Sequence, residues 1–205
     1  MHIADGVLST PVLLGSTAIA AAGLAAGVRT LTPEKIPRVA VLSSAFFVGS
    51  LIHLPVGPTS VHLILTGLLG LILGLAVIPA LFVALTLQVI LFQFGGLTTL
   101  GANLLIMSFP AVLCHLLFKR TVHNSSKVVV WLGGFGAGFF AVGLSAMLLA
   151  AALALSGDAF GEAAVAAFIA HLPVMVAEGI FTGFCIAFLR RVKPELLGCM
   201  AYPVD

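Results

Sequence analysis

Charged residues are scarce in this chain of 205 residues. Asp, Glu, Lys and Arg together make up 8% of it, whereas 61% is hydrophobic and the mean hydropathy is +1.25. A chain of this composition cannot fold as a soluble globular domain, so we interpret it as an integral membrane protein surrounded by the lipid bilayer. The formal net charge of +2 is too small to indicate nucleic acid as a partner.

Cysteines and phosphate-binding motifs are also rare or missing. Cys114, Cys185 and Cys199 are isolated and no CxxC spacing occurs, which argues against a disulfide framework or a thiolate metal site. The chain has no GxxxxGK[ST] phosphate loop, and the connections between its apolar segments are too short to hold an ATPase. If this protein moves a solute uphill, the energy comes from a partner or from an ion gradient.

The beginning of the chain has no basic residue before Arg29. A secretory signal would start with a basic region and be cleaved, so we expect this N-terminus to be retained. The bulky side chain of His2 should also prevent the removal of Met1, which leaves the α-amine on Met1.

Hydrophobic segments dominate the rest of the sequence, at about residues 7–28, 39–54, 61–78, 79–94, 102–118, 128–155 and 162–189. A helix needs about 20 residues to cross a bilayer, so we predict a single all-α membrane domain over residues 1–205, a bundle of seven transmembrane helices. If the N-terminus is outside and the C-terminus cytoplasmic, all nine Lys and Arg residues fall on the cytoplasmic side, as the positive-inside rule predicts. Merging the third and fourth segments would break this pattern.

The first two residues carry three nitrogens that are separated by only two or three carbon atoms each. These are the α-amine of Met1, the amide nitrogen of His2 and Nδ1 of the His2 imidazole. They can close two fused chelate rings in one plane around a metal ion, a geometry that suits Ni(II) or Cu(II) rather than Zn, Mg or Ca. The alternative is that His2 is simply a solvated residue at the end of the chain.

Two further histidines are expected on the same outer side of the membrane. His62 follows Gly57-Pro58-Thr59-Ser60, and Ser60 could cap the third helix, so His62 is a candidate fourth nitrogen; a hydrogen-bonded or headgroup-contacting histidine is the alternative. His53, at the end of the second span, is a possible extra ligand or could orient His62 through a hydrogen bond. Packing at the membrane interface explains His53 equally well.

An acidic residue and a glycine-rich loop are also expected on this side. Asp5 is a possible extra ligand or a partner of the ligands. The loop over residues 95–101 contains three glycines and two threonines, and glycine permits close approach of the backbone. This loop could therefore fold down over a small site, or it could be an ordinary flexible turn.

His171 and Glu178 lie seven residues apart in the last span and so share one helix face. Ionisable groups within a span are costly and usually face protein or a water-filled cavity, so both are candidates for a functional site. A structural polar cluster near Pro173 is the competing interpretation. If this cluster carried the function, the protein would be a membrane enzyme or an uncoupled facilitator for small solutes.

Four sequence blocks carry a resemblance to a known family, namely residues 1–6 (MHIADG), 57–63 (GPTSVHL), 91–103 (LFQFGGLTTLGAN) and 177–183 (AEGIFTG). They resemble the CbiM/NikM substrate-binding membrane proteins of energy-coupling factor (ECF) transporters for cobalt and nickel. Each block alone is a weak signal, but together they occur in order from residue 1 to residue 183.

The resemblance implies a seven-helix metal-capture subunit in the cell membrane of a bacterium or archaeon, with its N-terminus tucked into the bundle. Met1, His2 and His62 would bind Ni(II) or Co(II) as the transported substrate, with no resident cofactor and no enzymatic activity of its own. The family works with a transmembrane coupling subunit, two ATPase subunits and often a small additional membrane subunit. Nickel suits a planar site with an amide nitrogen better than cobalt does. His53 departs from the family pattern.

Overall fold

The computed structural model describes residues 2–51, 53–56 and 59–198, and for residues 53–56 and 59–62 it describes the backbone alone. Its helices are α1 (Thr10–Val28), α2 (Ile36–Leu51), α3 (Thr66–Leu73), α4 (Val77–Phe92), α5 (Leu100–Val122), α6 (Lys127–Ala154) and α7 (Gly161–Val192). A short hairpin of β1 (His53–Val56) and β2 (Thr59–His62) precedes α3. Three 3₁₀ turns complete these elements, η1 (Gly74–Ala76), η2 (Asp158–Phe160) and η3 (Pro194–Leu197).

The structure confirms a helical, multi-pass membrane protein. Five helical stretches are long and apolar enough to cross a membrane, namely Thr10–Val28, Thr66–Phe92, Leu100–Val122, Lys127–Ala154 and Gly161–Val192. Helix α2 is shorter, with 16 residues. Large apolar side chains such as Leu14, Val41 and Phe184 point outward, which is the arrangement expected of a surface in contact with lipid. Seven crossings and the orientation of the termini remain predictions.

The predicted third helix over residues 61–78 is wrong at its beginning. Strand β2 runs through His62 and pairs antiparallel with β1, and helix α3 starts only at Thr66. Thr59 and Val61 are β-branched residues, which fit a strand better than a capped helix start. Ser60 therefore lies in β2 and is not the cap of α3. The second predicted span, 39–54, likewise ends early, because α2 stops at Leu51.

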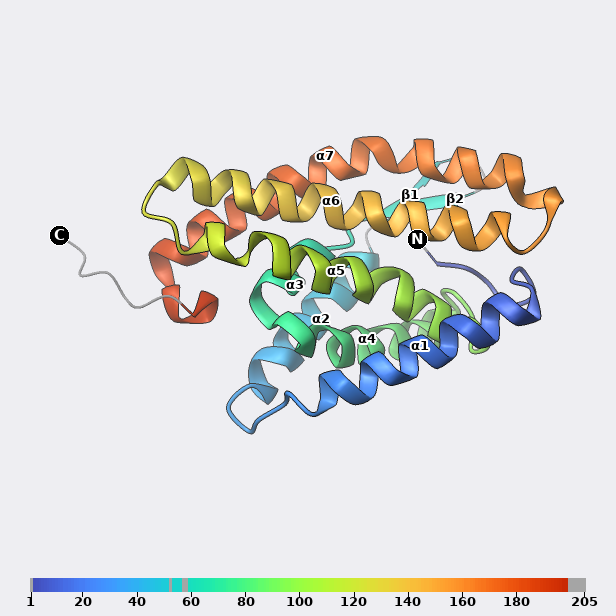
Figure 1. The fold of residues 1–205 in the computed structure, drawn as a ribbon, viewed down its shortest axis with the longest axis horizontal. Helices are drawn as coiled ribbons and strands as arrows, with labels where there is room; N and C mark the ends of the chain where they lie inside the picture. The colour runs from blue at the N-terminus through green and yellow to red at the C-terminus, as the bar shows by residue number, and fades with distance from the viewer. Residues whose placement is uncertain (1, 52, 57–58, 199–205) are drawn as a thin grey trace.

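The predicted boundary between the third and fourth spans, at residues 78 and 79, is wrong, because α3 ends at Leu73 and α4 begins at Val77. Gly74 follows α3 with φ +56° and ψ −131°, a conformation that side chains on L-residues disfavour. The ring of His115 packs 3.3 Å from where a Cβ on Gly74 would lie, and η1 then leads into α4. Figure 1 shows α4 running in a different direction from α3, with η1 between them.

Helices α6 and α7 lie side by side along their length (Figure 1). Their backbones touch through glycines: a Cβ on Gly134 would come within 2.9 Å of the Gly183 Cα, and a Cβ on Gly138 would overlap the backbone of Glu178. Gly67 brings α3 against the same place on α6, since its Cβ would lie 2.5 Å from the Ala137 oxygen. Small residues permit such close packing within a membrane, so the backbones of α3, α6 and α7 pack closely against one another at this point.

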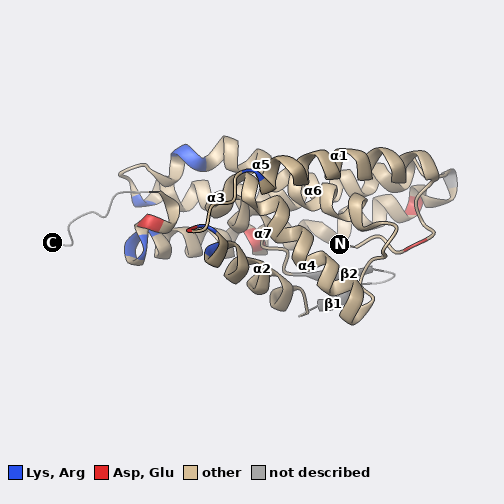
Figure 2. Ribbon diagram, turned by 90° about the horizontal axis from the view of Figure 1, so that it is seen from below, with Lys and Arg blue, Asp and Glu red and all other residues tan. Residues whose placement is uncertain are grey.

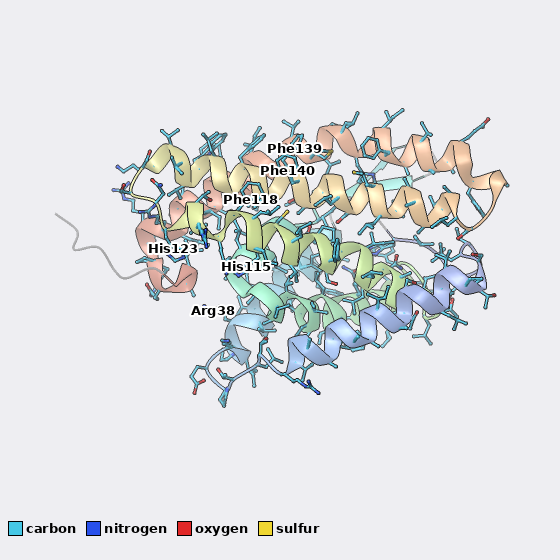
Figure 3. All side chains as sticks on the ribbon, in the orientation of Figure 1. Arg38, His115, Phe118, His123, Phe139 and Phe140 are labelled. Carbon is cyan, nitrogen blue, oxygen red and sulfur yellow. The ribbon has the colours of Figure 1, made fainter. Side chains whose placement is uncertain are left out.

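The basic residues gather at one end of the bundle. Figure 2 shows the Lys and Arg segments in the half nearer the C-terminus, around the ends of α1, α5 and α7 and the starts of α2 and α6. The η3 turn folds back beneath this end, where Arg38 donates to the Leu196 carbonyl over 3.3 Å. Figure 3 shows Arg38, His115 and His123 all towards this end. The positive-inside rule predicts such a distribution for a cytoplasmic face.

Candidate metal centre

The chain immediately after His2 is held inside the bundle by Asn103 and Thr99. The Ile3 amide donates to Asn103 Oδ1 over 2.9 Å, and Asn103 Nδ2 donates to the Ile3 carbonyl over 3.0 Å. The Thr99 hydroxyl donates to the same carbonyl over 2.7 Å. Ile3 is only 3% exposed, Asn103 2% and Thr99 0%. Because these groups are buried and paired, the segment that carries His2 has a fixed position.

Asp5 joins the same segment to the glycine-rich loop. Its carboxylate accepts hydrogen bonds from the Leu97 amide at 3.2 Å, from the Thr98 amide at 3.0 Å and from the Thr98 hydroxyl. The hydroxyl bond, more than the backbone bonds, holds the pKa of Asp5 below its ordinary value, because each bond favours the ionised form. We call the contacts of Ile3 and Asp5 with residues 97–103 the N-terminal clamp.

The glycines of the loop are required by this contact. A Cβ on Gly96 would overlap the Asp5 carboxylate, and Gly95 has φ +81° with the Asn103 amide 2.9 Å from where its Cβ would lie. Glycine removes both obstacles. Of the two interpretations of residues 95–101, the structure therefore supports a loop folded down over the N-terminal segment.

The His2 ring lies against an aromatic side chain. It stacks on Phe94 with ring centroids 6.3 Å apart and an angle of 15° between the planes. Phe94 stacks in turn on Phe92. His2 is half-buried as a residue and both of its ring nitrogens are buried, so it is not a solvated end of the chain. Met1 lies outside the described residues, so the three-nitrogen chelate stays a prediction.

The β1–β2 hairpin pairs the other two predicted histidines. Its register sets His53 opposite His62, and Leu54 opposite Val61. Both views draw the hairpin beside the start of the described N-terminal segment (Figures 1 and 2). The side chains of His53 and His62 lie outside the described part of the chain, so their roles as ligand and partner remain predictions.

The structure gives His171 and Glu178 different hydrogen-bond partners. His171 Nδ1 is 2.6 Å from the Ala167 carbonyl of its own helix. The Glu178 carboxyl accepts from the amides of Ile64, by a short contact, and Leu65, at 2.9 Å. These are bonds to backbone groups, as the structural interpretation of the cluster expects. Among the described residues, no group of three or more His, Cys, Asp or Glu side chains could hold a metal ion.

The sequence interpretation missed the roles of Asn103 and Thr99. Both lie in the block 91–103, and Asn103 is a polar residue within the apolar α5. A buried amide in such a helix has to find partners, which is the signal that could have identified it.

The fold defines a class, a helical multi-pass membrane protein. A solved structure described as a transition metal transporter superimposes with a TM-score of 0.76, at 25% identity over 94% of this chain and 93% of that one. A putative metal transport protein of Haemophilus influenzae is 42% identical, over 96% of this chain and 97% of its own length. A fused nickel transport protein of Rhodobacter capsulatus is 32% identical over 96% of this chain, which spans 64% of that protein.

The family model for the cobalt uptake substrate-specific transmembrane region, CbiM, matches residues 2–196. The chain belongs to the CbiM family. It is therefore a component for the uptake of cobalt or nickel, and the resemblance seen in the sequence blocks is confirmed.

Proposed function

We propose that this protein captures one Ni(II) or Co(II) ion at the outer face of the cell membrane of a bacterium or archaeon. The α-amine of Met1, the amide and Nδ1 of His2 and the imidazole of His62 would be its four nitrogen ligands. Nickel is favoured, because a planar set that includes an amide nitrogen suits Ni(II) better than Co(II). The relative from Rhodobacter capsulatus carries nickel in its name.

The N-terminal clamp is the observation that supports this proposal most directly. A chelate built from the first two residues binds tightly only if those residues are already ordered, since ordering them on binding would cost conformational entropy. The bonds from Asn103 and Thr99 to Ile3 hold the chain one residue after His2. The geometry of the clamp is thus what a preorganised N-terminal ligand set requires.

We further propose that transport is driven by partner subunits: a membrane coupling subunit, two ATPases and often a small additional membrane subunit, as in ECF transporters. The chain itself contains no phosphate loop. Co-expression tests this proposal. Cells with this chain and the coupling subunits should accumulate radioactive Ni(II), and cells with the chain alone should not. Uptake by the chain alone, insensitive to loss of ATPases, would instead favour an uncoupled facilitator.

Metal binding by the purified protein tests the ligand set. His2→Ala, or an N-terminal extension long enough to move the α-amine away from His2, should abolish tight binding of Ni(II) in equilibrium dialysis. His123→Ala at the basic end provides a matched control and should bind as the wild type does. Unchanged affinity in both N-terminal variants would defeat the chelate. A membrane enzyme or facilitator based on His171 and Glu178 would retain its activity in these variants.

A further inference from the structure

The Glu178 carboxyl contacts the segment that follows His62. It is 0% exposed, and Oε1 accepts from the amides of Ile64 and Leu65. Its Oε2 has no hydrogen-bond partner in the described part of the chain. The hydrogen bonds that the structure gives this buried carboxyl therefore all go to the two residues before α3, and none goes to another side chain. We call this pair of bonds the Glu178 contact.

The start of α3 needs such an acceptor. Helix starts leave backbone amides without a partner in the helix, and Leu65, the residue before the first turn, offers no side-chain cap. Leu65 also has φ +55°, which is uncommon for a residue with a side chain. From α7, Glu178 supplies an acceptor for the Leu65 amide, which has no partner within the helix, and for the Ile64 amide before it. These two bonds hold Leu65 in its unusual conformation.

The position of Glu178 is itself fixed by close packing. The backbone of α7 at Glu178 lies against Gly138 of α6, where a Cβ would overlap it. Gly67 of α3 touches the same part of α6. Helix α3 and residue 178 are therefore both packed against one rigid backbone, so the carboxyl can define where β2 ends and α3 begins.

We infer that Glu178 is a positioning residue for His62, acting through the amides of Ile64 and Leu65. This inference rests on the proposed function, in which His62 supplies the fourth nitrogen to the metal. Only Leu63 separates His62 from the amides that Glu178 holds, so the Glu178 contact limits how far the end of β2 can move. An oxygen acceptor at this distance is what matters, and the charge of the carboxylate is not required.

Copper(II) added to the purified full-length protein provides a spectroscopic test. The electron paramagnetic resonance spectrum of the wild type should show four nitrogen ligands, and that of His62→Ala should show three. Glu178→Ala should give the His62→Ala spectrum and bind Ni(II) about tenfold to a hundredfold more weakly, the usual cost of losing a partner that orients a ligand. Glu178→Gln keeps the accepting oxygen and should restore the wild-type spectrum.

Two further variants distinguish the positioning of His62 from a nonspecific loss of structure. Thr182→Val removes another buried polar group one turn along α7, leaves both amides paired and should bind as the wild type does. If Glu178→Ala fails to fold, Glu178→Asp replaces it, because the shortened carboxylate keeps its charge but cannot reach both amides. A four-nitrogen spectrum in the Ala or Asp variant, or equal loss in Thr182→Val, overturns the inference. Absence of nitrogen ligation in the wild type overturns the proposed function instead.

Discussion

The two sides of the candidate metal centre are held in different ways. On the N-terminal side, Ile3 and Asp5 make six hydrogen bonds with residues 97, 98, 99 and 103. The hairpin side has the Glu178 contact, in which one carboxyl accepts two amides. The loss of any one clamp residue leaves part of the N-terminal set in place, whereas the loss of Glu178 removes both bonds of the hairpin side at once. The hairpin side is therefore the side from which one substitution removes every bond of the Glu178 contact.

The hydrogen bonds of the N-terminal clamp differ in how deeply they are buried. Asn103 and Thr99 are buried and hold the backbone of Ile3, whereas Asp5 is exposed and holds the loop at its outer edge. Hydrogen bonds to buried groups are costly to lose because no water replaces them, whereas exposed bonds compete with water. Three substitutions test this order, from the inside of the clamp to its edge.

Asn103→Leu should have the largest effect within the clamp. It leaves the Ile3 amide without its acceptor and removes one of two donors to the Ile3 carbonyl, at a cost of about 1–3 kcal/mol for each buried group left unpaired. We expect Ni(II) affinity to fall about a hundredfold in equilibrium dialysis. Thr99→Val removes only one of the two donors to the Ile3 carbonyl and leaves the Ile3 amide paired, so its affinity should lie between those of the wild type and Asn103→Leu. Equal affinities in all three proteins would show that Ile3 is held by something else.

The parts of this site that could be predicted from sequence are those in which the residue type fixes the chemistry. His2, Asp5 and the glycines of residues 95–101 were identified because a second-position histidine, a carboxylate and a glycine-rich loop each have a short list of uses. Asn103 was not identified, because a lone amide side chain in an apolar helix does not reveal which partner it has. The hairpin was missed because Thr59-Ser60 before an apolar run also fits a helix start, and only its pairing with β1 decides between them.

The helix pattern was predicted well where hydrophobic length alone decides it. Helices α1, α5, α6 and α7 lie within a few residues of their predicted spans. The region between α2 and α4 was predicted less well, because it depends on particular contacts. Gly74 ends α3, and Glu178 holds its start from a helix more than a hundred residues away. Periodicity in a single segment carries no information about such partners.

Gly96→Ala should have an intermediate effect. The new methyl group would overlap the Asp5 carboxylate, so either the loop or Asp5 has to move. The Ile3 bonds remain, and we expect Ni(II) affinity to fall about tenfold, as for the loss of one orienting contact. Gly161→Ala, at the start of α7, has nothing within 4 Å of the new methyl group and tests for nonspecific effects of an added methyl. Similar losses in both variants would contradict a role for the contact between Asp5 and Gly96.

Asp5→Asn should have the smallest effect, about threefold in Ni(II) affinity, because an exposed charge-assisted bond competes with water. The pKa of Asp5 is lowered, so its contribution is present above the ordinary aspartate range and is lost only as the pH falls through the lowered value. The ligand nitrogens must be free of protons to bind a metal, so affinity falls as the pH drops whatever the state of Asp5. Metal release on acidification should therefore come from protonation of the ligand nitrogens, with the clamp still closed, and the threefold change in affinity should move its midpoint in Asp5→Asn by no more than about half a pH unit. Titrating bound Ni(II) from pH 8 to pH 5 measures both midpoints, and a larger shift in the variant would mean that Asp5, and not the ligand nitrogens, controls release.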